Sequence, residues 1–328
     1  MSAPRDALAI EDLHVAYRAG SRTVQAVAGV SLRVAPGEAL GIVGESGCGK
    51  STLIMAALGL LDPATAEIRS AGVRLGEADL ANPASRQRVL GRRIGVVFQN
   101  PLSALNPVLT IERQLVDHMR WHLGLSTRAA RTRATRLLEE VGIVDPARRL
   151  GAYPHEFSGG MLQRVTIAMA LACDPAFVIA DEPTTALDAT VQAEIVDLVL
   201  ALRRERGLGL IWITHDLALL SQVADRVAVM YAGRIVEIGP TARIYDAPSH
   251  PYARALLDSV RSLWSGGEGP FRTIPAGDGA FRDDDRACAF APRCGARGAA
   301  CAARPPLTPS GAGGHEVACW HPCAEGAP

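Results

Sequence analysis

One eight-residue run constrains the chain more than any other feature. Residues 44–51 have the sequence GESGCGKS and match the phosphate-binding motif G-x-x-x-x-G-K-[ST] without a gap. An apolar run at residues 39–43 precedes the motif, and a helix-like stretch at residues 52–58 follows it. The motif therefore lies at a strand-to-helix turn, where backbone N–H groups and the helix N-terminus can face a polyphosphate. An ordinary glycine-rich turn is the alternative interpretation, and the complete motif disfavours it.

The motif predicts how a nucleoside triphosphate binds. Lys50 would place its ammonium group on the β- and γ-phosphates, and the Ser51 hydroxyl would bind a Mg²⁺ ion that bridges the same oxygens. The residues expected to line this site are Gly44, Glu45, Ser46, Gly47, Cys48, Gly49, Lys50, Ser51 and Thr52. Taken alone, the motif suits a kinase, a GTPase or a helicase equally well.

The charge balance limits the partners of the chain. Its 328 residues include 34 Lys and Arg against 34 Asp and Glu, so it lacks the positive excess typical of proteins that bind nucleic acid or anionic lipid. No basic segment followed by an apolar core opens the sequence, and its longest apolar stretches, such as residues 165–173, are far shorter than the roughly 18 residues of a membrane span. We expect a cytoplasmic protein that reaches a membrane only through another protein and has no nucleic-acid partner.

Short apolar runs alternate with amphipathic stretches, and this alternation predicts an α/β fold with a mainly parallel sheet. The expected strands are residues 39–43, 94–98, 177–180, 210–214 and 227–231. Residues 110–144 have apolar side chains at helical spacing and no strand signal, so they predict a helical insertion, which we place at about residues 100–160.

The composition changes after residue 261. Residues 265–270, SGGEGP, predict a linker. The segment beyond is rich in Pro, Gly and Cys and too poor in large apolar side chains to build a core of its own. We therefore divide the chain into a nucleotide-binding domain at residues 1–260 and a linker with a small Cys-rich extension at residues 261–328.

Polar residues follow three of the expected strands. The strand at residues 177–180 leads into Asp181, which would hold Mg²⁺ directly or through water, and Glu182, the natural base for an attacking water. Gln99 ends another strand, where its amide could touch the metal or the water, and His215 follows a third, where it could lie beside the γ-phosphate. Each residue alone is more often structural, and the phosphate-binding motif upstream favours the functional interpretation.

The turn Ser158-Gly159-Gly160 opens a further predicted helix and offers a second anion site, made from a helix N-terminus and a hydroxyl group. A single bound nucleotide does not require two phosphate-binding sites in one chain, but a head-to-tail dimer of two chains does.

With the phosphate motif, Gln99, Asp181-Glu182, Ala186-Leu187-Asp188 and His215 in this order, the chain resembles an ABC-type ATPase subunit over about residues 8–323. The resemblance implies a P-loop NTPase core with a helical insertion, in which two subunits close on two ATP molecules. It also implies roles for residues outside the phosphate motif: Tyr17 stacks on adenine, Asp188 communicates across the dimer, and Ser158, Gly159, Gly160 and Met161 serve the partner's ATP.

A narrower resemblance is to the subgroup that energises oligopeptide, dipeptide and nickel import. The segments that carry it are residues 98–107, 153–161, 185–192 and 250–257. It implies a peripheral subunit at the cytoplasmic face of the inner membrane, with a second ATPase subunit, identical or homologous, two membrane permease subunits and an extracytoplasmic solute-binding protein. Lys50 and Mg²⁺ would then act on the phosphates, with Glu182 and His215 at the attacking water.

Other functions remain as alternatives. A nickel or other small-solute importer of the same subgroup would share every motif. A soluble ABC ATPase of DNA repair or translation is disfavoured because the sequence has no long coiled-coil insertion and no net positive charge. An exporter is disfavoured because the sequence has no membrane spans, and a regulatory module is disfavoured because Glu182 and His215 are both present.

The C-terminal segment concentrates cysteines. Those beyond residue 287 are Cys288, Cys294, Cys301, Cys319 and Cys323. Cytosolic thiols are kept reduced, so we expect metal or cluster ligation in preference to disulfides. The subgroup resemblance implies a four-iron four-sulfur cluster on the first four of them. Zinc, unligated thiols and a disulfide stay open, as do Cys323 and His321 as ligands.

Overall fold

The computed structural model describes residues 6–19, 22–185, 187–264, 286–311 and 313–323. The linker expected at residues 265–270 lies outside them. The chain folds into two compact units, each assembled from separate stretches. The first unit contains the described parts of residues 1–8, 34–38 and 74–213, and the second contains those of residues 9–33, 39–73 and 214–328.

The first unit combines helices with parallel strands and a short antiparallel strand. Its strands are β6 (Ala78–Asp79), β7 (Ile94–Val97), β8 (Phe177–Asp181) and β9 (Gly209–Thr214), and β5 (Gly72–Leu75) leads into it. Its helices are α2 (Pro83–Val89), α3 (Pro101–Ala104), α4 (Ile111–Leu123), α5 (Thr127–Glu140), α6 (Pro146–Arg149), η1 (Pro154–Glu156), α7 (Gly159–Leu171) and α8 (Ala189–Arg206).

Strand β8 lies between β7 and β9 and pairs with both in parallel. Phe177 is opposite Ile94 on one side and Gly209 on the other. Every residue of β8 and β9 is buried. Both strands are nearly continuous apolar runs because a parallel sheet is covered on both faces. The predicted parallel core is confirmed for these strands.

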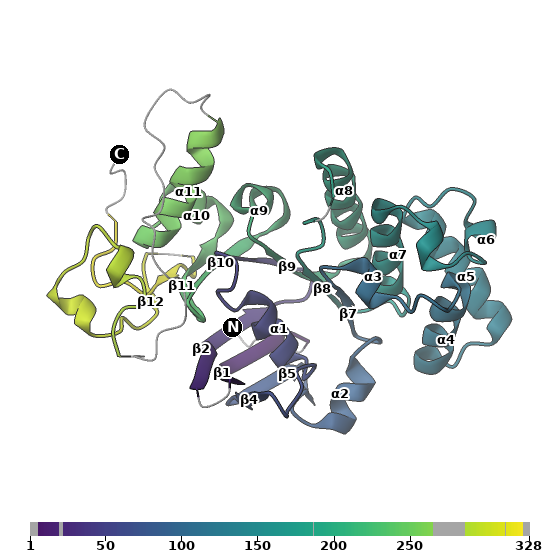
Figure 1. Ribbon diagram of the computed structural model, residues 1–328, viewed down its shortest axis with the longest axis horizontal. Helices are drawn as coiled ribbons and strands as arrows, with labels where there is room; N and C mark the ends of the chain where they lie inside the picture. Colours follow the sequence, from purple (N-terminus) through teal and green to yellow (C-terminus); the bar gives the residue numbers. More distant parts are fainter. Residues whose placement is uncertain (1–5, 20–21, 186, 265–285, 312, 324–328) are drawn as a thin grey trace. The chain divides into compact units, whose positions relative to one another are not determined.

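Helices form where the sequence predicts the insertion. Apolar residues four apart in α4, Ile111, Leu115 and Met119, are all buried, and α4 packs on α5, which in turn packs on α7. The Thr110 hydroxyl caps the N-terminus of α4 by accepting the N–H of Arg113, and Gly124 ends the helix in a left-handed conformation. Figure 1 shows α4 to α7 grouped together. The helical character predicted for this part of the chain is confirmed.

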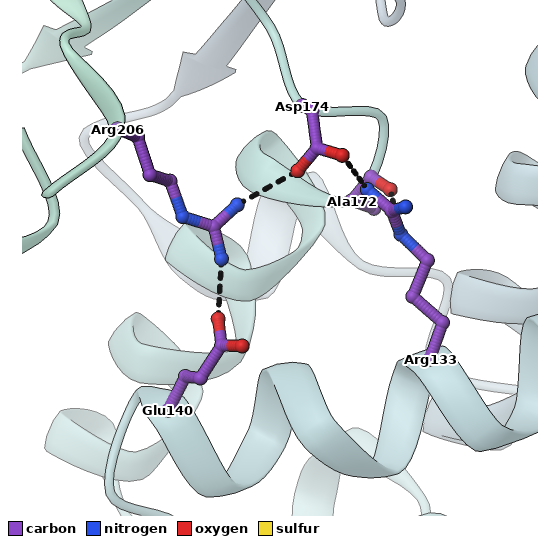
Figure 2. A network of polar contacts seen from close by, with 5 residues as sticks. All are labelled: Arg133, Glu140, Ala172, Asp174 and Arg206. Atoms are coloured by element: carbon purple, nitrogen blue, oxygen red, sulfur yellow. Dashed lines mark hydrogen bonds and ion pairs between the residues drawn. The ribbon is translucent and has the colours of Figure 1, made fainter.

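An ion network joins α5 to the C-terminal end of α8 (Figure 2). Arg206, the last residue of α8, binds Glu140 of α5 and donates to Asp174 at 2.9 Å, in the turn before β8. Arg133 of α5 reaches the same Asp174 at 2.6 Å and the carbonyl oxygen of Ala172 at 2.9 Å. The network thus ties the helical insertion to the elements that flank β8.

The second unit contains the phosphate-binding motif and the C-terminal segment. Its strands are β1 (Leu8–Ala19), β2 (Arg22–Val34), β3 (Ala39–Val43), β4 (Ala66–Arg69), β10 (Arg226–Tyr231), β11 (Arg234–Pro240), β12 (Thr308–Pro309) and β13 (Glu316–Val317). Its helices are α1 (Lys50–Ala57), α9 (Leu217–Val223), α10 (Thr241–Asp246), α11 (Pro251–Trp264), η2 (Ala291–Arg293) and η3 (Ala299–Ala302).

The strands of the second unit pair in both directions. Strand β10 lies parallel to β3, as the sequence predicts, but it pairs antiparallel with β11 through the turn after Tyr231. Strand β1 pairs antiparallel with β4. The antiparallel strands make the sheets mixed, because short turns such as that between β10 and β11 can only reverse the chain.

The C-terminal segment is attached to the rest of its unit through β11. Strand β13 pairs with it, placing Val317 opposite Glu237. The Glu237 side chain is fully buried and accepts the N–H groups of Ser249 at 2.8 Å and His250 at 2.7 Å, while His315 Nε2 lies 2.8 Å from it. Since these partners satisfy the buried carboxyl group, the segment packs without a large apolar core of its own.

Candidate nucleotide site

The phosphate loop connects β3 to α1, and its backbone fits tightly against neighbouring strands. A Cβ atom at Gly44 would stand 2.1 Å from the carbonyl oxygen of Met230. At Gly49, which caps α1 with a φ of 105°, it would stand 2.3 Å from the carbonyl oxygen of Ala26. Both positions therefore require glycine, and the predicted strand-loop-helix arrangement is confirmed.

Lys50 lies within the loop, with 4% of the residue exposed. Its Nζ donates to the carbonyl oxygens of Gly44 at 2.8 Å and Glu45 at 3.1 Å. An ammonium group held on neutral carbonyls can transfer to phosphate oxygens, which carry full negative charge. Lysine and the N-terminus of α1 together make this loop suited to bind an anion.

Two other predicted nucleotide contacts lie beside α1. The Tyr17 hydroxyl, on β1, is 3.5 Å from the hydroxyl of Thr52 in the first turn of the helix, and Tyr17 is partly exposed. Cys48 is 3% exposed, and burial raises the pKa of its thiol. The Tyr17 ring is therefore partly exposed beside the phosphate loop, whereas the Cys48 thiol is buried.

Glu45 has contacts that the sequence does not predict. The guanidinium group of Arg293, in the C-terminal segment, donates to both oxygens of the Glu45 carboxylate. The Tyr252 hydroxyl, on α11, accepts the Glu45 N–H at 2.9 Å. Tyr252 stands in one of the segments that resemble the importer subgroup, and that resemblance is the signal in the sequence that could have singled it out.

The carboxyl end of β8 carries the predicted metal ligand and base. Asp181 is 8% exposed and ends the strand. Glu182 follows with a left-handed φ of 45°, and its N–H donates to the carbonyl oxygen of Ile213. Its carboxylate accepts hydrogen bonds from Gln99 Nε2 at 3.2 Å and from the Thr185 hydroxyl at 2.9 Å. The structure thus brings Gln99 and Glu182 together, and it adds Thr185, three residues after Glu182.

The Ser158 turn begins a helix, as the sequence predicts. Ser158 is the N-cap of α7, and its hydroxyl accepts the N–H of Met161 at 3.4 Å. Ser158 and Gly159 are exposed, so the N-terminus of this 13-residue helix faces solvent. Asp188 is likewise an N-cap, accepting the N–H groups of Thr190 and Val191 at the start of α8.

His215 is exposed in the turn between β9 and α9. The next residue, Asp216, caps α9 by accepting the N–H of Leu219 at 3.2 Å.

The predicted site residues are divided between the units. Gln99, Asp181, Glu182 and the Ser158 turn belong to the first, and Tyr17, the phosphate loop and His215 belong to the second.

Both residues expected to hold Mg²⁺ carry oxygen donors, the type of ligand that Mg²⁺ prefers: Ser51, in the second unit, has a hydroxyl, and Asp181, in the first, has a carboxylate. Because Mg²⁺ in such sites keeps several waters and takes phosphate oxygens, it needs only one or two protein ligands.

The expectation of an iron–sulfur cluster in the C-terminal segment is not supported. Among the residues that the structure describes, no three His, Cys, Asp or Glu side chains are placed to hold a metal ion. Cys288, Cys294, Cys301, Cys319 and Cys323 are free thiols. Burial raises the pKa of Cys288, and it raises that of Cys319 to about 11. The zinc alternative, with Cys323 or His321 as further ligands, is unsupported for the same reason.

Within the described ranges, no helix combines the length and apolar character needed to cross a membrane.

Two family models match the chain. The model described as ABC transporter matches residues 27–185. The model described as the C-terminal region of oligopeptide/dipeptide transporters matches residues 236–301. Together they cover both the phosphate loop and part of the Cys-rich segment.

Similar proteins agree with these matches. The dipeptide transport ATP-binding protein of Bacillus subtilis (strain 168) is 43% identical over 318 residues, covering 95% of this chain and 94% of that protein. A dimeric ATP-binding cassette in a post-hydrolysis state with ADP and phosphate is 27% identical, with a TM-score of 0.61, over 71% of this chain and 98% of that one. A subunit of an ABC transporter complex from Clostridium perfringens is 26% identical, with a TM-score of 0.59, over 79% and 96%.

Proposed function

The chain belongs to the ABC transporter family as an ATP-binding subunit that hydrolyses ATP, and we propose that this hydrolysis drives the import of dipeptides or oligopeptides. The observation that carries the proposal is the continuous similarity to a dipeptide transport ATP-binding protein, 43% identical over 95% of this chain. The match to the C-terminal region of oligopeptide/dipeptide transporters supports the same substrate class.

In this proposal the second unit binds the triphosphate. Lys50 leaves the carbonyl oxygens of Gly44 and Glu45 for the β- and γ-phosphates, and the N–H groups at the start of α1 face the same oxygens. Tyr17 stacks on the adenine. Ser51 and Asp181 are the residues that would hold Mg²⁺, which would neutralise phosphate charge.

Glu182 is the base that takes a proton from the attacking water. Gln99 and Thr185 donate hydrogen bonds to its carboxylate and thereby orient the base. His215 would lie beside the γ-phosphate and help to position the same water. Orientation and charge stabilisation supply most of the rate enhancement in phosphoryl transfer.

The complete site requires a second subunit. Ser158, Gly159, Gly160 and Met161 begin α7, whose exposed N-terminus would contact the γ-phosphate of an ATP bound to the partner. The similar cassette that was solved as a dimer supports this arrangement. Asp188, at the start of α8, would lie near the same dimer interface. The second subunit is either a copy of this chain or a homologous ATPase.

The remaining partners follow from the importer class. Two membrane permease subunits would hold the ATPase at the cytoplasmic face of the inner membrane, and an extracytoplasmic solute-binding protein would deliver the peptide. We assign the ATPase to residues 1–260, with the insertion at about residues 100–160, and the importer-type extension to residues 261–328.

Reconstitution with the permease tests this function. The chain, its ATPase partner and the permease subunits that co-purify with it would be placed in proteoliposomes with a solute-binding protein, and phosphate release would be measured with dipeptide, oligopeptide or Ni²⁺. We expect stimulation by the peptide-loaded binding protein. Stimulation by Ni²⁺ alone would reassign the substrate, and a chain that instead co-purifies with DNA or ribosomes would contradict the importer.

A further inference from the structure

The C-terminal segment reaches into the phosphate loop at Glu45. Arg293 Nη1 donates to Glu45 Oε2 at 2.8 Å and Nη2 donates to Oε1 at 2.9 Å, so the pair is bidentate. Two parallel hydrogen bonds between charged groups fix the carboxylate in orientation as well as in position. Only 8% of the Arg293 side chain is exposed, which limits screening by water.

Tyr231 completes the surroundings of Arg293. Its hydroxyl accepts from Arg293 Nη1 at 3.3 Å, and the guanidinium carbon lies 5.8 Å from the centre of the Tyr231 ring. Tyr231 ends β10, the strand that pairs with β3 directly before the phosphate loop. Arg293 is therefore packed against the end of β10, next to the strand that leads into the loop.

Tyr252 holds the backbone of the same residue. Its hydroxyl accepts the Glu45 N–H, and its ring is fully buried against Tyr231 and Phe290, with ring centres 4.7 and 5.4 Å away. Burial raises the pKa of Tyr252, so the hydroxyl remains neutral and serves as an acceptor. Glu45 is thus held at its carboxylate by the C-terminal segment and at its N–H by α11.

Glu45 in turn organises the loop. Its carbonyl oxygen accepts the N–H of Cys48 at 3.2 Å and one hydrogen bond from the Lys50 ammonium group at 3.1 Å. A shift of Glu45 would therefore move both the turn of the loop and the resting position of its lysine.

The C-terminal segment is itself firmly attached near Tyr252. The N–H of Cys323 donates to the carbonyl oxygen of Ser249 at 2.7 Å, two residues before α11 begins. His315 Nδ1 lies 2.6 Å from the carbonyl oxygen of Ser310, while its Nε2 faces Glu237, as described above. The C-terminal segment is therefore connected to the phosphate loop through α11, whose Tyr252 contacts Glu45, and through Arg293.

We propose that the C-terminal segment controls the affinity of the phosphate loop for ATP, with Arg293 and Tyr252 as positioning residues that set Glu45. Arg293 does not touch the nucleotide in this proposal and acts through Glu45. The proposal rests on the function proposed above, because it assumes that the loop binds ATP.

The test measures binding of a non-hydrolysable ATP analogue with Mg²⁺ to the full-length chain by calorimetry. Arg293→Gln and Glu45→Gln should each raise the dissociation constant about tenfold, and the double variant should be no weaker than either single variant, because both remove the same interaction. Arg297→Gln is the matched control, since Arg297 is an exposed arginine in the same segment; its binding should stay within about twofold of wild type.

Steady-state ATP hydrolysis separates positioning from general damage. Arg293→Gln should raise the KM for ATP by about the same factor and leave kcat within about twofold of wild type. If Arg293→Gln fails to fold, Tyr252→Phe, which removes one oxygen from a buried ring, should still raise the dissociation constant about threefold. Wild-type affinity in a folded Arg293→Gln or Tyr252→Phe chain, or additive losses in the double variant, would overturn the proposal. A wild-type chain that binds no nucleotide would instead refute the proposed function.

Discussion

Gln99 donates a hydrogen bond from Nε2 to Oε2 of Glu182 at 3.2 Å, although 83 residues separate them in the chain. The contact joins the residues that follow two neighbouring parallel strands, β7 and β8. Polar residues at the carboxyl ends of such strands meet at one edge of the sheet, which is where ligands bind in α/β folds. The proposed base and the amide expected to touch the metal or the water are thus in direct contact.

The Thr185 hydroxyl donates to the same Glu182 oxygen at 2.9 Å, so we expect it to orient the base. Thr185→Val keeps the shape but removes the donor, and should lower kcat about tenfold with little change in nucleotide binding. Thr185→Ser retains the hydroxyl and serves as the control, with a kcat close to wild type. Equal rates for the valine and serine variants would show that this hydrogen bond has no part in turnover.

Gly159 and Gly160 start α7 but differ in their surroundings. A Cβ at Gly160 would lie 2.7 Å from Cγ1 of Val191, whereas at Gly159 the nearest atom would be 3.9 Å away. Gly160→Ala should therefore lower the free energy of unfolding by about 1–3 kcal/mol through overpacking. Gly159→Ala should change it by less than about 0.5 kcal/mol. Chemical denaturation measures both, and equal stability of the two variants would contradict the packing described here.

Arg206 links Glu140 and Asp174, and 20% of its side chain is exposed (Figure 2). Arg206→Ala should destabilise the protein by about 1 kcal/mol, because its carboxylate partners remain largely exposed and the gain from such pairs is modest. Arg204→Ala, an exposed arginine in the same turn of α8, should have a smaller effect. A melting temperature lowered equally by both changes would show that the network adds no stability.

His250 gives the stability a specific dependence on pH. Burial lowers the pKa of its imidazole from an ordinary value of 6.5 to about 4, and its Nδ1 accepts the N–H of Tyr252 at 3.0 Å. As the pH falls below 6.5 the unfolded chain takes up a proton that the folded chain takes up only near pH 4. His250 should therefore remove up to about 3 kcal/mol of stability across this window.

His250→Asn tests this dependence, because asparagine offers an acceptor in a similar place and does not titrate. Its free energy of unfolding should fall less steeply than that of wild type between pH 6.5 and pH 4. Parallel losses in the two proteins, measured by denaturant titration at each pH, would assign the acid sensitivity to other groups.

Short runs of consecutive residues were enough to predict the parts of the site that such runs form by themselves. The phosphate loop, the Ser158 turn and the strand before Asp181 depend on a few consecutive residues, and the structure has them where the sequence placed them. Asp188 also has a local signal, since an Asp before a helical stretch is a typical N-cap. Its role as the N-cap of α8 could have been predicted in addition to the role across the dimer that the family resemblance implies.

Contacts between distant segments could not be predicted in this way. Arg293 and Glu45 are 248 residues apart, and their pairing depends on how the C-terminal segment packs on β11. The cysteines show the opposite case. Their number and the subgroup resemblance favoured a ligand set, but neither fixes where the side chains lie, and the described residues do not form a site that could hold a metal.

The proposed ATP hydrolysis requires Glu182 as its base, and Glu182→Gln tests this role. The variant keeps the size of the side chain but cannot accept the proton, so phosphate release from ATP should fall at least about a hundredfold. Binding of Mg-ATP should persist, and the closed dimer should accumulate in size-exclusion chromatography with ATP. Phosphate release at a rate near wild type in this variant would rule out Glu182 as the base.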